Sequence, residues 1–300
     1  MNVIMIFINP INALLWSIRR DQRDVINLYN VLSPLMYITT GSTMLNFGYW
    51  SDEIRKPDEA QINLCKITGE MAELDTARNL VDVGSGLSSP AIWWKNRYNS
   101  LDLYCININY NQQVIANKIK DNFFNSKKSR RYSKDICLIN SSSLSLPFKK
   151  ESIDRIICLE AAQHFKPLTN FITQTRYILK PKGIMVIALP VITKLFNSVK
   201  NLLKLGILSF SWASEHYLLD YVSSIITNEK FKVIDIVKIG SHVYSPLAEF
   251  YIKNRKKLKY KICCEYHPVL EYILYRSILK MDKLSRDKII EYVIIKCVKI

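Results

Sequence analysis

The feature that most constrains this chain is a glycine turn that directly follows a short apolar run near residue 80. Asn79–Val83 has the character of a buried strand, Gly84-Ser85-Gly86 follows at once, and Pro90–Tyr98 has the character of a helix. Glycine permits the sharp bend and lets the main chain, through its N–H groups, approach a ligand closely. The dehydrogenase fingerprint would need a further glycine at Ser89. The turn therefore predicts a nucleotide-type site that differs from a dinucleotide site.

Beyond this turn, short apolar runs alternate with helical stretches. Further strands are expected at Leu101–Ile108, Ile136–Ile139, Ile153–Leu159, Ile184–Leu189, Phe231–Ile239 and Glu291–Lys299. Strands separated by helices of this length imply βαβ units and a parallel sheet. The predicted fold class is therefore α/β, with a Rossmann-like, doubly wound sheet of seven strands.

The rest of the chain is expected to surround this sheet with helices. Residues 1–78 are predicted to be a helical segment that packs on the core, with helices over Asp24–Tyr37, where Ser33-Pro34 is a stop signal, and Ala60–Leu74. Residues 79–300 are predicted to form one domain with insertions at about 191–216 and 240–290. Both insertions follow strand ends at the edge where such a sheet binds its ligand, so they are expected to form a helical lid.

The net charge of +16 is the most unusual property of the composition. Much of it comes from two basic clusters, Lys127–Lys134 and Lys253–Lys261. Such a balance suits nucleic acid, an anionic membrane surface or an acidic substrate, and it also suits a lysine-rich surface with no partner. The apolar N-terminus, Met1–Trp16, is short and interrupted for a membrane span. The chain is therefore expected in the cytoplasm, with peripheral membrane contact as an option.

Cysteine and histidine usage excludes two further classes of protein. The seven cysteines contain no C-x-x-C pair, and the four histidines are scattered along the chain. Buried thiols in a reducing compartment are therefore expected, with neither a disulfide framework nor a metal site.

A polar side chain ends the strand that follows the glycine turn. Asn107 lies about twenty-five residues beyond the turn, where such folds hold ribose hydroxyls, commonly with an acid. An amide still supplies an acceptor and donors, although it lacks the charge of a carboxylate.

Five motifs occur in the order known from one enzyme family. They are Asp82-Val83-Gly84-Ser85-Gly86, the strand end at Asn107, Leu146-Pro147-Phe148, Ser152-Ile153-Asp154 and Leu179-Lys180-Pro181-Lys182-Gly183. Together they resemble class I S-adenosylmethionine-dependent methyltransferases of the small-molecule (type 11) branch. The segment Asn46–Trp50 is similar to one in the tocopherol, macrolide-sugar and phthiotriol-type enzymes. The resemblance implies six parallel strands and an antiparallel last strand.

The resemblance also implies which residues hold the cofactor, S-adenosyl-L-methionine. Asp82 and the backbone of Gly84, Ser85 and Gly86 would hold its methionine portion, and Asn107 with Ile108 its ribose. Ser142 and Ser143 would lie near the adenine, although the family usually has an acid at Ser142. Tyr49 would close over the methionine end, and Glu160 would make structural or cofactor contacts. Ordinary core packing remains the alternative for the aromatic segment that contains Tyr49.

His164 follows the strand Ile153–Leu159, where the reactive methyl group of this family emerges. Histidine titrates near working pH, so we expect His164 to act as a base or to orient the acceptor. The alternative is a histidine that only hydrogen-bonds the cofactor loop.

Three functions remain open at this point. The first is methyl transfer to a small molecule, in which the insertions build a pocket for an isoprenoid, quinone or polyketide acceptor, with oxygen as the favoured acceptor atom. The second is RNA methylation, which the charge suggests, but the segment Glu160–Gln163 lacks the Asn/Asp-Pro-Pro-aromatic run that grips a flipped base. The third is a catalytically silent binding protein that has kept the fold, suggested by Asn107 and Ser142.

Overall fold

A computed structural model describes residues 19–126, 136–193 and 215–300 of the chain. The basic cluster Lys127–Lys134 and the apolar N-terminus Met1–Trp16 lie outside the described residues. So does nearly all of the insertion expected at 191–216. Val191 and Ile192 themselves belong to a strand.

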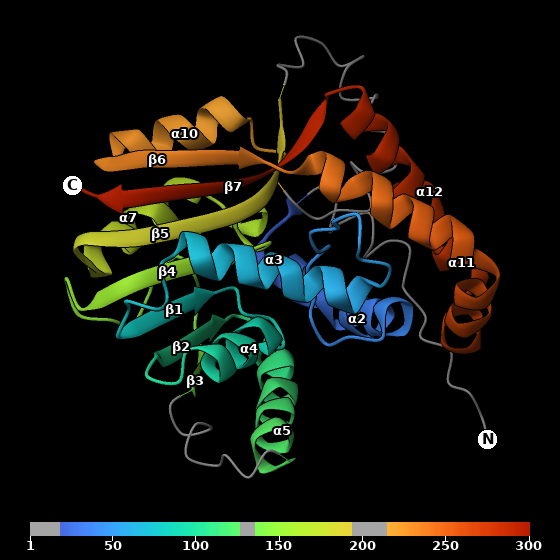
Figure 1. Ribbon diagram of the computed structural model, residues 1–300, viewed down its shortest axis with the longest axis horizontal. Helices are drawn as coiled ribbons and strands as arrows, with labels where there is room; N and C mark the ends of the chain where they lie inside the picture. The colour runs from blue at the N-terminus through green and yellow to red at the C-terminus, as the bar shows by residue number, and fades with distance from the viewer. Residues whose placement is uncertain (1–18, 127–135, 194–214) are drawn as a thin grey trace.

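The centre of the molecule is a seven-stranded sheet with the order β3-β2-β1-β4-β5-β7-β6 (Figure 1). Its strands are β1 (Asn79–Val83), β2 (Asp102–Asn107), β3 (Ile136–Asn140), β4 (Ile153–Leu159), β5 (Leu179–Ile192), β6 (Phe231–Lys238) and β7 (Ile290–Lys299). Only β7 is antiparallel to its neighbours, which it joins by inserting between β5 and β6. The predicted α/β fold with an antiparallel last strand is confirmed.

Helices cover both faces of the sheet and enclose a separate apolar core on each. One core lies under α3 (Pro57–Met71), α4 (Ser89–Arg97) and α5 (Tyr110–Ser126), and the other under α7 (Leu168–Ile178) and α10 (Leu219–Asn228). Side chains of β1 alternate between the two, so that Leu80 joins the first core and Val81 the second. Burial on both faces explains why the central strands are continuous apolar runs.

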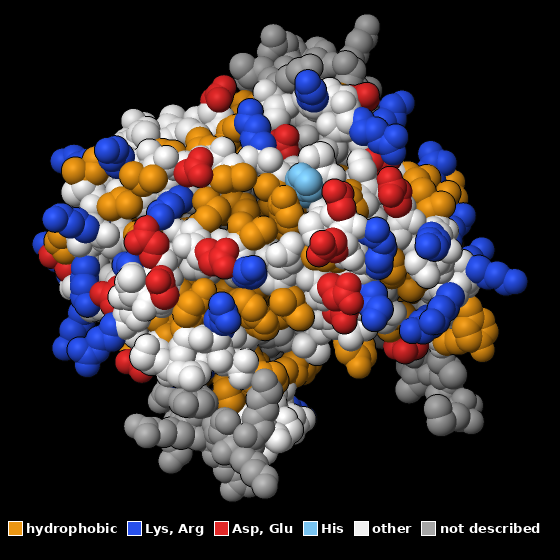
Figure 2. All heavy atoms as spheres, in the orientation of Figure 1, with side chains coloured by type: hydrophobic (Ala, Val, Ile, Leu, Met, Phe, Trp, Pro, Cys, Tyr) orange, Lys and Arg blue, Asp and Glu red, His pale blue; other side chains and the backbone are white. Residues whose placement is uncertain are grey.

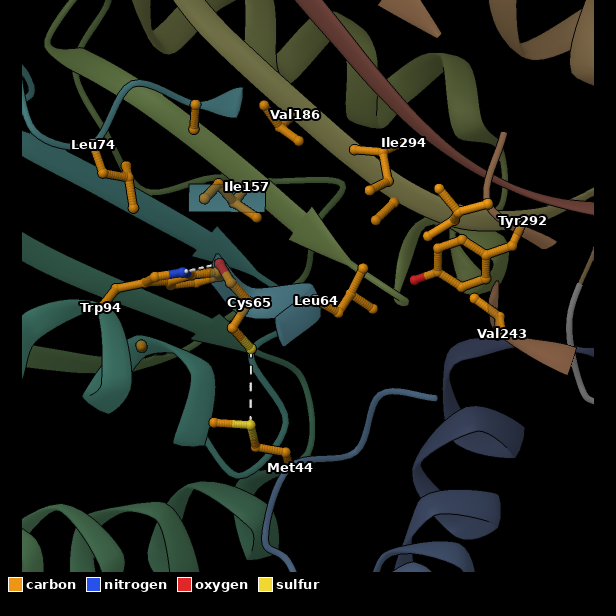
Figure 3. Packing of buried hydrophobic residues seen from close by; sticks show 14 of the residues in the cluster. Met44, Leu64, Cys65, Leu74, Trp94, Ile157, Val186, Val243, Tyr292 and Ile294 are labelled. Carbon is orange, nitrogen blue, oxygen red and sulfur yellow. Dashed lines mark hydrogen bonds between the residues drawn. The ribbon is translucent and has the colours of Figure 1, made fainter. Parts of the chain in front are cut away.

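The first core holds the helix that follows the glycine turn in place (Figure 3). The indole Nε1 of Trp94 on α4 donates a 2.8 Å hydrogen bond to the carbonyl of Cys65 on α3, and the Cys65 thiol contacts Met44 Sδ at 3.8 Å. Trp94 and Cys65 are fully buried. These contacts connect α3, α4 and the segment around Met44, so the start of α4 has a defined position relative to the sheet.

The helix α2 (Gln22–Thr40) begins with a capping box formed by Asp21 and Asp24 and ends at Gly41, whose φ is +74°. The expected stop at Ser33-Pro34 was wrong, because the helix continues through Pro34. Proline removes one hydrogen bond from the helix ladder. The buried Leu35 nevertheless packs against α11 (Tyr244–Glu265), and this tertiary contact stabilises the second half of α2.

The insertion at 240–290 forms the short turn η2 (Gly240–His242) and two helices, α11 and α12 (Pro268–Arg286), which lie side by side (Figure 1). Leu35 of α2 packs against Ile262 and Tyr266, and the hydroxyl of Tyr266 donates to the carbonyl of Val31. The segment with α11 and α12 therefore packs against α2 and stabilises its position. Among the described helices, none is both long enough and apolar enough to cross a membrane.

Candidate active site

A cavity of about 340 Å³ opens at the carboxyl ends of the four adjacent strands β3, β2, β1 and β4. Its floor comes from the loops after these strands, and its roof comes from α2 through Val25, Ile26 and Tyr29. The volume is in the range of pockets that hold small molecules. No residue of α11 or α12 is among those that line this cavity, so within the described part of the chain the covering element is α2, and the insertion at 240–290 only supports it.

The glycine turn borders the cavity through Gly84 and Gly86, which carry no side chain, and through Ser85 between them. Gly84 and Gly86 have φ values of +79° and +54°, which favour glycine. The N–H groups of Gly84 and Ser85 both donate to the carbonyl of Ile106, at 2.8 and 3.0 Å. These two N–H groups therefore extend the pairing of β1 with β2. What the turn offers at this point is a bare main-chain surface.

Asn107 lies at the cavity wall, and it connects the glycine turn to α2. Its amide nitrogen donates to the Gly86 carbonyl at 3.2 Å and to Gln112 Oε1 at 2.9 Å, and the Gln112 amide donates to Ser33 Oγ on α2. Since the amide hydrogens are used within the protein, a ligand hydroxyl at Asn107 would be met by Oδ1. Ile108 lines the cavity beside it.

Ser142 and Ser143, which follow β3, line the end of the cavity that lies farthest from β4. The Ser142 hydroxyl accepts hydrogen bonds from the Gln22 side chain, at 2.8 Å, and from the Leu144 N–H, at 3.1 Å. Gln22 is the first residue of α2, so this contact closes one end of the roof onto the floor.

Glu160 lines the cavity directly after β4, with φ at +53°. Its Oε1 accepts hydrogen bonds from the Phe47 N–H at 2.8 Å and from the Tyr292 hydroxyl at 2.9 Å. Burial raises the pKa of Glu160 to about 8, because desolvation outweighs these two hydrogen bonds. Glu160 thus attaches the segment around Phe47 to the end of β4 and carries a carboxyl that is neutral at pH 7.

His164 lies in a short helical turn, η1 (Ala162–His164), at the end of the cavity opposite Ser142. Its Nε2 is 3.0 Å from the hydroxyl of Tyr29, and the two rings meet edge to face. Burial, aided by the nearby Glu160, raises the pKa of Tyr29 well above its usual range. The phenol therefore stays protonated, and the imidazole is the member of this pair that can take up a proton.

Two expected cofactor residues lie outside the cavity lining. Tyr49 stacks on His242 at a centroid distance of 4.7 Å, because its backbone is held by Ala60 of α3 and directs the ring toward η2. From this part of the chain, Leu45 and Asn46 line the cavity wall instead.

Asp82, the second of these residues, lies inside the sheet on β1. Burial raises its pKa to about 7, and its Oδ2 has no hydrogen-bond partner among the described residues.

The residues of α2 were missed by sequence reasoning. Gln22, Val25, Ile26 and Tyr29 are spaced at i, i+3, i+4 and i+7, so they lie on one side of the helix, while Leu28 and Leu35 are buried elsewhere on it. This mixed polar and apolar spacing is also typical of ordinary helix packing, so it does not by itself indicate a cavity wall.

The sheet order, the glycine turn and a cavity at the carboxyl ends of the strands define a class I methyltransferase domain. Residues 81–187 match the family described as "Methyltransferase domain". This confirms the resemblance: the segment is a methyltransferase domain of the S-adenosylmethionine-dependent class.

One curated relative and two solved structures are also similar to this chain. Erythromycin 3''-O-methyltransferase from Saccharopolyspora erythraea is 27% identical over 172 residues, which cover 57% of this chain and 54% of that protein. The chain thus matches about half the length of this curated relative. Among solved structures, the cyclopropane synthase MmaA2 from Mycobacterium tuberculosis has a TM-score of 0.77 at 14% identity, covering 93% of this chain and 99% of that chain. The cyclase SpnF has a TM-score of 0.72 at 19% identity, with 92% and 95% covered. These two likenesses establish the fold and leave the reaction open.

Proposed function

We propose that this protein transfers a methyl group from S-adenosylmethionine to a small, apolar or partly apolar acceptor, with oxygen as the favoured acceptor atom. The observation that carries the proposal is that one cavity of about 340 Å³ is bordered both by the bare turn Gly84–Gly86 and by His164. In this proposal residues 79–300 form the cofactor-binding domain and the segment 1–78 is its cap.

The lining fits the proposed cofactor. An elongated cofactor would lie between the two ends of the cavity. Ser142, Ser143 and Ile108 line one end, and Glu160 and the glycine turn line the other. A Cβ on Gly86 would approach Leu45 Cδ1, another lining atom, to 3.2 Å, so a side chain there would enter occupied space. When bound, the cofactor supplies an electrophilic methyl group. The lining residues named above would hold the cofactor, whereas Asp82 and Tyr49 lie outside the lining and would support it without touching the cofactor.

In this proposal His164 and Tyr29 orient the acceptor, and His164 accepts its proton. A hydroxyl that becomes an ether must lose its proton, and in this proposal the imidazole of His164, which lines the cavity, takes it up. Tyr29 holds the ring from α2 and so fixes its position. Because methyl transfer needs an in-line arrangement, holding the acceptor correctly would provide much of the acceleration.

The wall chemistry supports a small acceptor with apolar parts. Apolar side chains that line the cavity include Val25, Ile26, Leu87, Leu144, Leu159 and Phe165. Such a lining binds by excluding water, while a few polar groups set orientation. The named activity of the curated relative, O-methylation of erythromycin, is of the same kind.

Calorimetry with S-adenosylhomocysteine tests the cofactor site. The variant Gly86→Asn should lose binding at least tenfold, because asparagine tolerates a positive φ and its side chain would occupy the turn surface. Gly41→Asn is the matched control: its φ is +74° and a Cβ there would meet nothing within 4 Å. Absence of binding by the unaltered protein at millimolar ligand would instead favour a catalytically silent protein.

A transfer assay tests the reaction. The protein and methyl-labelled S-adenosylmethionine are incubated with hydroxylated isoprenoids, quinols and polyketides in one arm and with RNA in another. Label in a small-molecule product supports the proposal, and His164→Ala should lower its turnover while leaving S-adenosylhomocysteine affinity within twofold. Label that enters only RNA would replace the proposal with the RNA methyltransferase alternative.

A further inference from the structure

The outward face of α11 carries a dense group of lysines with apolar side chains among them. We call this surface the α11 face: it consists of the exposed residues Ile252, Lys253, Lys256, Lys257, Lys259, Tyr260 and Lys261. Tyr260 is 74% exposed and Ile252 50%. Figure 2 shows the same mixture, with Lys and Arg crowded along the edge formed by α11 and α12 and hydrophobic side chains between them.

The spacing of six of these residues places them in two neighbouring rows along the helix. Ile252, Lys256 and Tyr260 are spaced at i, i+4 and i+8, and Lys253, Lys257 and Lys261 form the neighbouring row. Like charges at i, i+4 repel and destabilise a helix. Within the described ranges, no ion pair involves any of the five lysines. Repulsion among these lysines therefore destabilises α11 locally, and no ion pair within the described residues offsets it.

The arginine of the same helix is used differently. Arg255 turns inward, where its guanidinium lies 3.0 Å from the buried Glu271 and 3.5 Å from the centre of the Tyr275 ring. Lysine presents a point charge, whereas arginine supplies the planar fork that recognises individual phosphates. The cations of the outward face are lysines, with exposed tyrosine and isoleucine among them and with the exposed Glu249 and Glu265 toward the two ends of the helix. Such a face suits a diffuse negative surface better than the bases and phosphates of a nucleic acid.

We propose that the α11 face docks on an anionic lipid surface, with its lysines against the headgroups and with Tyr260 and Ile252 in the interfacial layer. Tyrosine favours this layer because its ring is apolar and its hydroxyl remains hydrated. The face is mechanically connected to the cavity, because α11 packs through Ile262 and Tyr266 on α2, the roof of the site. Docking would bring that roof close to a membrane in which an apolar acceptor dissolves.

Co-sedimentation with vesicles tests the docking surface on the full chain. The protein should bind vesicles of phosphatidylcholine with 30% phosphatidylserine at low salt, bind less at high salt, and leave pure phosphatidylcholine vesicles unbound. A juxtamembrane lysine contributes about fivefold to binding. The triple variant K253Q/K257Q/K261Q should therefore bind the anionic vesicles about 100-fold more weakly. Tyr260→Ser should weaken binding several-fold at unchanged charge.

The matched control removes the same charge elsewhere. Lys118 on α5, Lys149 before β4 and Lys232 on β6 are exposed, and K118Q/K149Q/K232Q should keep most of the vesicle binding. Equal losses in both triple variants would overturn the proposal, since net charge alone would then be responsible. So would tighter binding to a single-stranded RNA oligomer than to vesicles through the same three lysines. S-adenosylhomocysteine affinity, measured in the same preparations, reports on the cofactor site separately.

Discussion

Replacing Glu160 with glutamine tests whether the carboxyl after β4 is neutral in the folded protein. Burial raises the pKa of Glu160 to about 8, while its Oε1 accepts from the Phe47 N–H and the Tyr292 hydroxyl. Glutamine keeps an oxygen for both hydrogen bonds and removes the titration. The variant therefore isolates the effect of the ionisable group.

The magnitude follows from the two pKa values. The folded-state pKa of Glu160 lies above the ordinary value of 4.5, so the folded protein binds the proton more tightly and unfolding releases it between these two values. The stability contribution is present at low pH and is lost as pH rises through that window, at about 1.4 kcal/mol per pH unit. From pH 5.5 to 7.5, the free energy of unfolding of the parent protein should fall by about 2.5 kcal/mol relative to Glu160→Gln, because titration is incomplete near each pKa.

Urea denaturation of both proteins at pH 5.5, 6.5 and 7.5 measures this difference. Asp82, whose pKa burial raises to about 7, titrates in both proteins, so its contribution cancels. A difference that stays constant within about 0.5 kcal/mol across the series would refute the reasoning, because Glu160 would then have to be ionised in the folded state throughout.

Two further predictions concern stability, each with a matched control. A Cβ on Gly84 would lie 2.2 Å from the Ala161 Cβ, so Gly84→Ala should cost about 2–5 kcal/mol, against about 1 kcal/mol for Gly41→Ala, where only the positive φ is strained. Equal urea midpoints for these two variants would contradict the close contact. Arg255→Leu leaves Glu271, only 1% exposed, without its cationic partner, and should cost about 2 kcal/mol or more. Arg286→Leu, at a pair whose arginine is 67% exposed, should cost less. Thermal unfolding of both variants checks the order, and a larger loss for Arg286→Leu would reverse it.

The central sheet was predictable from sequence because its signals are local. A strand buried on both faces must be apolar along its length, and the turn Gly84–Gly86 needs positive φ at two positions. Each requirement is visible within a few residues. Asn107, Ile108, Ser142 and His164 could also be placed at the cavity, since parallel strands bring their carboxyl ends to one edge.

The parts that sequence reasoning missed depend on contacts between distant segments. The helix α2 passes Pro34 because Leu35 packs against Ile262 and Tyr266, more than two hundred residues away. Tyr49 turns from the cavity because its backbone is held by α3 and its ring by His242. Nothing near either residue in the chain indicates these partners.

By itself, the sequence determined the layered α/β architecture, the glycine turn and the strand ends that surround a ligand, because period and turn chemistry act over short stretches. Only the tertiary structure decided which helix roofs the cavity, that Tyr29 meets His164, and that Glu160 is held neutral. Burial and pairing between segments far apart in the chain control these features, since desolvation and hydrogen bonding depend on every neighbour of a group, wherever it lies in the sequence.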